Sequence, residues 1–149
     1  MKRYIESTLA IGFLFLGGLI YLLYRNDSLL MFRWLDTVYA DGVVATMRDY
    51  SVIYKKHLPE WFIFSLPQAL WLYSGIVGMN CIWWKNRNKS CFWISIFFAI
   101  AIGMELSQAT GYIPGNYDHV DAALLILALA AGLYTNGIFN QEGNGHEEI

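Results

Sequence analysis

Four polar residues around the end of the third long apolar stretch could carry chemistry. Glu105 and Gln108 are three residues apart, so a helix would present both on one face. Asp118 and Asp121 follow a Pro-Gly turn and would stand at the start of the next helix. Carboxyl and amide groups arranged in this way could bind a polar head group or act as general acid and base. Because polar side chains are costly within apolar segments, a functional role is the first hypothesis.

Three further residues complete the predicted ligand-binding set. Asn116 lies in the turn before Asp118, and Gln68 and Trp71 lie in the second apolar stretch. The short turn makes the third and fourth stretches antiparallel neighbours, so we expect their polar residues to converge with Gln68 and Trp71 close by. The predicted set is Gln68, Trp71, Glu105, Gln108, Asn116, Asp118 and Asp121.

Structural roles compete with these functional ones. Asp118 is a good helix N-cap, and Asp121 would lie favourably against the positive end of the same helix. The chain shows no metal-ligand spacing such as HExxH, so we predict neither a metal site nor a cofactor. Ser107 neighbours Glu105 but has no base placed to activate it, which favours a non-enzymatic role.

The composition indicates a membrane protein. Of 149 residues, 56% are apolar and only 15% are charged, whereas soluble domains carry about 25% charged residues. Aromatic residues reach 17%, which suits the aromatic belts at membrane interfaces. The net charge of −2 offers no electrostatic basis for binding nucleic acid. Two cysteines do not form a disulfide framework.

Four continuous apolar runs each approach the roughly 20 residues that a helix needs to cross a bilayer. These runs predict an all-α integral membrane four-helix bundle, formed by a single domain over residues 1–139, with spans at about 5–24, 61–84, 91–112 and 120–138. The first run is long for a signal peptide and is interpreted as a retained anchor. Residues 140–149 are acidic and rich in glycine, so we expect a disordered tail.

The segment between the first two spans has amphipathic character. Apolar residues recur at helical spacing over 29–39 and 42–56, and both pieces are too short to span a membrane. We expect two helices at the outer membrane surface, which either pack on the end of the bundle or contact lipid.

The basic residues predict the orientation of the spans. Lys85, Arg87 and Lys89 lie in a short connection without acidic residues, which is typical of a cytoplasmic loop. We therefore expect a multi-pass protein of the inner (cytoplasmic) membrane with both termini in the cytoplasm. Residues 25–59 and 112–119 would then face outward, together with the polar site.

Two sequence blocks resemble the VanZ-like family of small integral membrane proteins. One is LPQALW at 66–71, which is followed by Tyr73-Ser74. The other combines ELSQ at 105–108 with IPGNYDHVD at 113–121, which is similar to that family's E-x-x-Q…G-x-x-D-x-x-D pattern. The resemblance implies a small four-helix membrane bundle, linked in some relatives to glycopeptide-antibiotic resistance.

Three functions fit these observations. The favoured one is a non-enzymatic protein of the cell envelope that binds a lipid or cell-wall precursor head group in an outward-facing polar pocket. The chain could instead be an assembly or sensor subunit of a membrane complex. It could also be a membrane enzyme that uses Glu105 with Asp118 or Asp121 as acid and base. The expected partners are membrane lipids and lipid-linked or cell-wall precursors, with no nucleic acid.

Overall fold

The fold is all-α, as the sequence predicts. The computed structural model describes residues 2–25, 41–113 and 117–141, and six helices make up all the regular structure of these residues. The helices are α1 (Lys2–Tyr24), α3 (Asp41–Lys55), α4 (Glu60–Phe64), α5 (Leu66–Ile82), α6 (Arg87–Ala109) and α7 (His119–Gln141).

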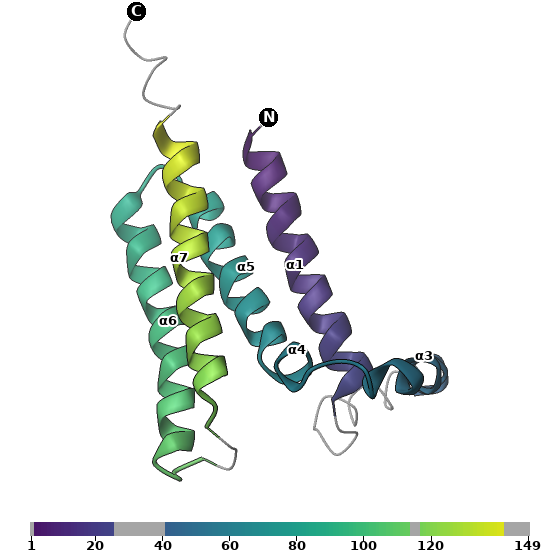
Figure 1. Ribbon diagram of the computed structural model, residues 1–149. Coiled ribbons are helices and arrows are strands. Elements are labelled where there is room, and N and C mark those ends of the chain that lie inside the picture. The colour runs from purple at the N-terminus through teal and green to yellow at the C-terminus, as the bar shows by residue number, and fades with distance from the viewer. Residues whose placement is uncertain (1, 26–40, 114–116, 142–149) are drawn as a thin grey trace, which may run out of the picture.

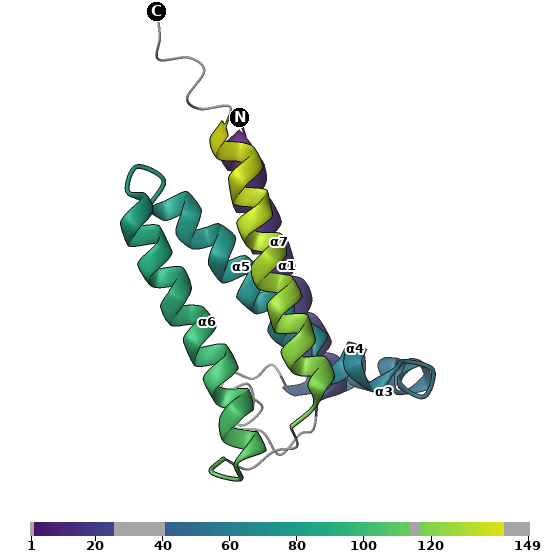
Figure 2. The same ribbon diagram turned by 60° about the vertical axis from the view of Figure 1, so that its left-hand side comes forward.

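Four long helices run alternately in opposite directions (Figure 1). Helix α5 is central, because α1, α6 and α7 all pack against it. The beginning of α1, the end of α7 and the turn between α5 and α6 lie at one end of the molecule (Figures 1 and 2). The turn from α6 to α7 lies at the opposite end, and α3 extends sideways from the final turns of α1.

The core lies where α5 meets α7 and α6. Ile76 is 0% exposed, Leu125 is 2% exposed and Leu72 is 5% exposed. Gly132 allows α7 to approach α5 closely, because an ideal Cβ at this position would lie 2.7 Å from Ile76 Cγ2. A small residue at such a crossing lets the backbones of two apolar helices approach and pack.

The predicted span at 61–84 is interrupted. Helix α4 ends at Phe64, and α5 begins at Leu66 with Ser65 between them. Pro67 occupies the first turn of α5, where its missing N–H is tolerated. A proline ring clashes with the preceding turn of a continuous helix, so the interruption falls just upstream of Pro67. A proline inside an apolar run predicts a kink, and here the structure shows two separate helices.

The boundaries of the last two long helices also differ from the predicted ones. Helix α6 begins at Arg87 because Asn86 caps it, accepting a hydrogen bond from the Lys89 backbone N–H at 3.1 Å. Helix α7 continues to Gln141, so the first two residues of the predicted tail are helical. Residues 142–149 of that tail lie outside the described residues.

Helix α3 covers nearly all of the predicted helix at 42–56, whereas the predicted helix at 29–39 lies outside the described residues. The polar side of α3 binds the end of α1. The Arg48 guanidinium donates hydrogen bonds to the carbonyls of Leu22 and Arg25, at 3.0 and 2.5 Å. The Ser51 hydroxyl lies 3.3 Å from the Leu23 carbonyl. The two hydrogen bonds from Arg48 satisfy carbonyls that have no partner within α1 itself, whereas the single O–H of Ser51 is 2.8 Å from the nearer Arg48 carbonyl.

The apolar side of α3 faces away from the rest of the protein. Met47, Tyr50 and Tyr54 follow helical spacing and are 41%, 72% and 65% exposed. These are the residues whose spacing predicted the helix. Of the two arrangements expected for this segment, the structure shows α3 packed on the end of α1, and contact of its exposed apolar side with lipid stays a prediction.

Two helices are long and apolar enough to cross a membrane, namely Tyr4–Tyr24 and Arg87–Ala109. Only 17% of the apolar window of each is buried, so neither resembles the core helix of a soluble protein. Helix α7 is apolar over the shorter range His119–Thr135. Large side chains such as Phe15 and Leu127 are 73% and 62% exposed. Apolar exposure on this scale marks a surface that contacts lipid or protein.

Candidate functional site

Glu105 is the most deeply buried ionisable side chain among the residues that the structure describes. It lies on α6, one turn before the helix ends at Ala109, and it is 2% exposed. Its Oε2 atom has no hydrogen-bond partner. Buried polar atoms are rarely left in this state, because an unpaired polar group away from water is costly.

Two aspartates of α7 lie close to Glu105. Asp118 is the N-cap of α7, with its Oδ1 accepting a hydrogen bond from the Val120 backbone N–H at 2.9 Å. Asp121 is half-buried, and its Oδ1 is buried without a hydrogen-bond partner. Both carboxylates lie close enough to Glu105 to repel it electrostatically when it is ionised.

The C-terminus of α6 shows how the chain begins to turn towards α7. Gly111 has a φ of +75°, a conformation that glycine adopts without strain. The Gly111 N–H donates to the Gln108 carbonyl, and the Tyr112 N–H donates to the Ser107 carbonyl. This hydrogen-bond pattern is a Schellman motif, which ends a helix and redirects the chain. The sequence analysis attributed the reversal to Pro114 and Gly115, which lie outside the described residues.

The amides of the predicted set do not pair with Glu105. Gln108 is half-buried near the end of α6, and Gln68 is half-buried in the first turn of α5. No hydrogen bond joins either side chain to Glu105 in the described part of the chain. Asn116 lies outside that part.

Trp71 packs against α1. Its indole Nε1–H points to the Leu14 carbonyl at 3.3 Å, and its ring lies 5.3 Å from the ring of Tyr21. An ideal Cβ at Gly17 would lie only 2.7 Å from Trp71 Nε1. The sequence predicted Trp71 close to the acidic residues; the contacts of its ring that the structure describes are with Leu14, Gly17 and Tyr21 of α1.

The acidic cluster, defined as Glu105, Asp118 and Asp121, can accept hydrogen bonds and attract positive charge. No basic side chain forms an ion pair with these three residues in the described chain. No three His, Cys, Asp or Glu side chains within it are placed to hold a metal ion. Ser107 is engaged elsewhere, since its hydroxyl donates to the Gly103 carbonyl at 2.7 Å. The geometry therefore suits reversible binding more than nucleophilic catalysis.

A second polar cluster, which the sequence analysis missed, lies towards the opposite end. Glu6 of α1 is 9% exposed, and its Oε2 is 3.5 Å from the thiol Sγ of Cys81 on α5. Next to Cys81 along the chain, Asn80 accepts a hydrogen bond from the hydroxyl of Ser90 on α6. The signal in the sequence was Glu6 itself, a charged residue inside a predicted span.

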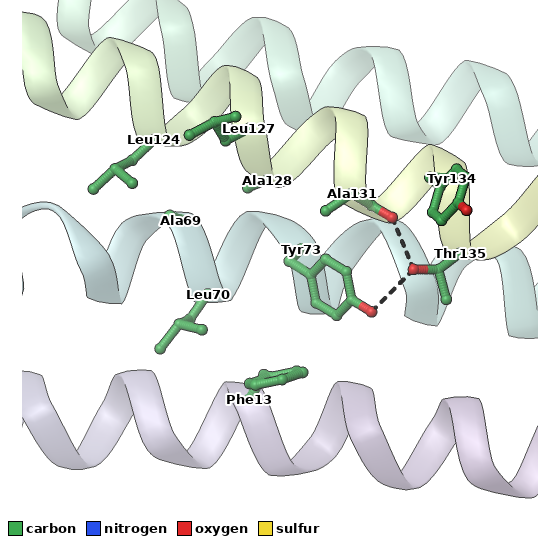
Figure 3. A pocket seen from close by; sticks show the side chains of 10 residues that line it. All are labelled: Phe13, Ala69, Leu70, Tyr73, Leu124, Leu127, Ala128, Ala131, Tyr134 and Thr135. Atoms are coloured by element: carbon green, nitrogen blue, oxygen red, sulfur yellow. Dashed lines mark hydrogen bonds between the residues drawn. The ribbon is translucent and has the colours of Figure 1, made fainter.

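An apolar groove of about 440 Å³ runs between α1, α5 and α7 (Figure 3). Phe13 of α1 and Tyr73 of α5 meet edge to face, with ring centroids 5.3 Å apart. The Tyr73 hydroxyl lies 3.3 Å from the Thr135 hydroxyl, which itself donates to the Ala131 carbonyl. None of the three acidic-cluster residues lines this groove.

Comparison of the chain with protein-family models, characterised proteins and solved structures finds no match. We therefore infer function from the side chains and their geometry.

Proposed function

We propose that this chain is an integral membrane protein of the cell envelope, similar to the VanZ-like family, that binds the head group of a lipid or a lipid-linked cell-wall precursor. The pocket is the acidic cluster of Glu105, Asp118 and Asp121, and the protein acts by binding rather than by turnover. One observation carries this proposal: the Glu105 carboxyl is 2% exposed and its Oε2 has no hydrogen-bond partner.

The surface of the helices supports a membrane location. Helices α1 and α6 are long and apolar enough to cross a bilayer, and their apolar windows are largely unburied. Helix α5, extended by α4, and helix α7 supply the other two spans of the proposed four-span protein. Acyl chains would cover the exposed apolar side chains, which water would solvate poorly.

The proposed orientation places the turn between α5 and α6 in the cytoplasm of a cell whose inner membrane holds the protein. Lys85 lies over the ring of Trp84 at 5.1 Å, and Lys89 lies over the ring of Trp83 at 4.9 Å. Paired aromatic and basic residues are typical of a membrane interface, and basic loops favour the cytoplasmic side. The beginning of α1 and the end of α7 lie at the same end as this turn, so in the proposed orientation the acidic cluster and α3 face outward.

The unpartnered oxygen atoms indicate why a ligand would bind. Glu105 Oε2 and Asp121 Oδ1 are both buried without hydrogen bonds. A buried polar atom costs about 1–3 kcal/mol when it lacks a partner. A head group that donates hydrogen bonds would remove this cost, and lipid-linked molecules can reach the end of α6 from the bilayer.

The test is to measure which lipids remain bound to the purified protein. We expect native mass spectrometry of the full chain to show retained lipid for the wild type and markedly less for Glu105→Gln. The Gln side chain keeps the shape of Glu but removes its charge. Glu60→Gln is the matched control, because Glu60 is exposed in the first turn of α4. Equal lipid retention by the wild type and Glu105→Gln would contradict the proposal.

The proposed link to glycopeptide resistance has its own test. Glycopeptide antibiotics act on cell-wall precursors, so a protein that binds the same precursors could alter the sensitivity of the cell. We expect cells producing the wild type to tolerate more glycopeptide than cells producing equal amounts of Glu105→Gln. Equal tolerance would remove the resistance role while leaving lipid binding to be judged by mass spectrometry.

A further inference from the structure

We infer that the chemical group held by the acidic cluster is a primary ammonium group. This inference rests on the proposed function and names the class of ligand that the pocket selects. Its basis is the combination of three carboxyl groups on two neighbouring helices with two buried oxygen atoms, one on each helix, that lack hydrogen bonds.

The carboxylates of the acidic cluster are negatively charged, so the ligand group that binds to them is not an anion. Phosphate or carboxylate would meet Glu105, Asp118 and Asp121 without a basic side chain to balance them. Two arginines, one at the end of α1 and one on α3, have partners outside the acidic cluster. Arg48 binds carbonyls at the end of α1, and Arg25 lies 4.9 Å from the centroid of the Phe64 ring. Like charges brought together in a partly dry pocket repel strongly.

The spacing of the acidic side chains disfavours a metal ion. No three His, Cys, Asp or Glu side chains of the described chain are placed to hold one ion together. An ammonium group does not need three acidic ligands, because each of its N–H groups donates one charge-assisted hydrogen bond, at an N···O distance of about 2.7–2.9 Å, to a single oxygen. Two of its N–H groups would pair with Glu105 Oε2 and Asp121 Oδ1, the two buried oxygen atoms that lack hydrogen bonds. A quaternary ammonium has no such donor.

The depth of Glu105 matches the amine of a membrane-bound molecule. Glu105 lies four residues before the end of α6, which is about 6 Å at 1.5 Å per residue. A head-group amine would reach this level while its acyl chains stay in the bilayer. The amine could belong to an aminophospholipid or to the peptide of a cell-wall precursor, since both present a primary ammonium group.

The experiment compares lipids that differ in the head group alone. Full-length protein is reconstituted into nanodiscs that contain equal amounts of phosphatidylethanolamine, phosphatidylcholine and phosphatidylglycerol. The lipids that stay bound after gentle extraction are counted by native mass spectrometry. We expect phosphatidylethanolamine to be retained at least about tenfold over the other two, the size of effect that charge-assisted hydrogen bonds give. In Glu105→Gln and Asp121→Asn this preference should disappear, whereas Glu60→Gln should keep it.

A second arm separates the two sources of the amine. The same protein, in nanodiscs of phosphatidylcholine alone, is titrated with a soluble pentapeptide that is acetylated at its N-terminus and carries a free lysine amine, and with the same peptide acetylated at that lysine as well. Binding of the free-amine peptide alone assigns the pocket to a precursor peptide. Preference for phosphatidylethanolamine without peptide binding assigns it to the aminophospholipid. Far-UV circular dichroism and thermal unfolding of each variant confirm that the fold is retained.

Other outcomes overturn specific claims. Equal retention of phosphatidylethanolamine and phosphatidylcholine, lost in Glu105→Gln, would refute the need for N–H donors but leave head-group binding standing. Preference for phosphatidylglycerol would refute a cationic ligand. Displacement of the bound lipid by Mg²⁺ alone at micromolar concentration would assign the cluster to a metal ion. Retention that is identical in the wild type and Glu105→Gln, for every lipid and peptide, would overturn the proposed function itself.

Discussion

The indole of Trp71 lies directly against Gly17. An ideal Cβ at Gly17 would stand 2.7 Å from Trp71 Nε1 and 3.2 Å from the Pro67 carbonyl oxygen. The tryptophan therefore fills the space that a glycine leaves open, and the two residues set how closely α1 approaches α5. The same contact makes α1 an integral part of the packed helices.

The Gly17 contact predicts a loss of stability on adding one methyl group. We expect Gly17→Ala to lower the free energy of unfolding by about 1–3 kcal/mol, because Trp71 and the backbone at Pro67 would both have to move. Gly18→Ala is the control, since nothing lies within 4 Å of its ideal Cβ. That control should be neutral or more stable by up to about 1 kcal/mol, given the higher helix propensity of alanine. Thermal unfolding in detergent, followed by circular dichroism, measures both; equal stability would contradict the tight α1–α5 contact.

Gly132 gives a parallel prediction for α7. Its ideal Cβ would lie 2.7 Å from Ile76 Cγ2 and 3.1 Å from Ile76 Cβ, and Ile76 is 0% exposed. We expect Gly132→Ala to destabilise the protein by about 1–3 kcal/mol, since the buried side chain has little room to shift. Gly103→Ala should not destabilise it, because nothing lies within 4 Å of that Cβ.

A double-mutant cycle identifies the atoms responsible. Ile76→Ala alone should cost about 2–5 kcal/mol through the cavity that it leaves. Combined with Gly132→Ala, it should cost less than the sum of the two changes, because the added methyl group enters that cavity. Additive costs would show that the methyl group at position 132 does not contact Ile76.

Arg48 should stabilise the end of α1 from a neighbouring helix. Its guanidinium donates to the carbonyls of Leu22 and Arg25. We expect Arg48→Gln to cost about 1.5–3 kcal/mol, the value of hydrogen bonds that involve a charged group. Hydrogen exchange should also become faster in the last turn of α1, which loses this anchor. Lys56→Gln, at an exposed position just after α3, should leave stability within about 0.5 kcal/mol. Unchanged exchange in Arg48→Gln would show that α3 does not hold the end of α1.

The helices could be predicted from sequence because their signals are local. Long apolar runs with low charge fix the helical class and the approximate positions of α1, α6 and α7, since backbone groups in an apolar environment must pair within the segment. The amphipathic spacing of Met47, Tyr50 and Tyr54 likewise predicted α3. The interruption at Ser65 was missed, because the same apolar run continues on both sides of it.

The site was harder to predict because it depends on side chains that meet across helices. The Glu105 carboxyl was singled out because a charged group inside an apolar run is costly, and Asp118 shows the N-cap geometry that its residue type suggests. The sequence did not indicate that Trp71 contacts α1 or that Glu6 lies beside Cys81. The partners of these side chains depend on how α1 packs against α5. The spacing of apolar residues within one helix does not identify the helix that it contacts.

Helix α3 should lie in the interfacial region of the bilayer with Tyr54 towards the acyl chains. A nitroxide spin label attached at Tyr54→Cys should therefore be accessible to oxygen and shielded from a water-soluble nickel complex. Asp49→Cys supplies the control, because Asp49 is also exposed but lies about 140° around the helix from Tyr54, at 100° per residue. Both backgrounds carry Cys81→Ser and Cys91→Ser to remove the native thiols. Equal accessibility at the two positions would contradict an interfacial position for α3.

The orientation of the protein predicts which exposed positions react from outside the cell. Ala45 of α3 and Asn88 of α6 are both exposed, and they lie towards opposite ends of the helices. In the background without native cysteines, a membrane-impermeant maleimide added to intact cells should modify Ala45→Cys and leave Asn88→Cys unmodified. The proposed orientation gives this result, because Lys85, Arg87 and Lys89 favour a cytoplasmic position for the turn beside Asn88. After the membrane is permeabilised, both positions should react, which shows that Asn88→Cys is reactive in itself. Modification of Asn88→Cys in intact cells, with Ala45→Cys protected, would invert the protein and turn the acidic cluster towards the cytoplasm.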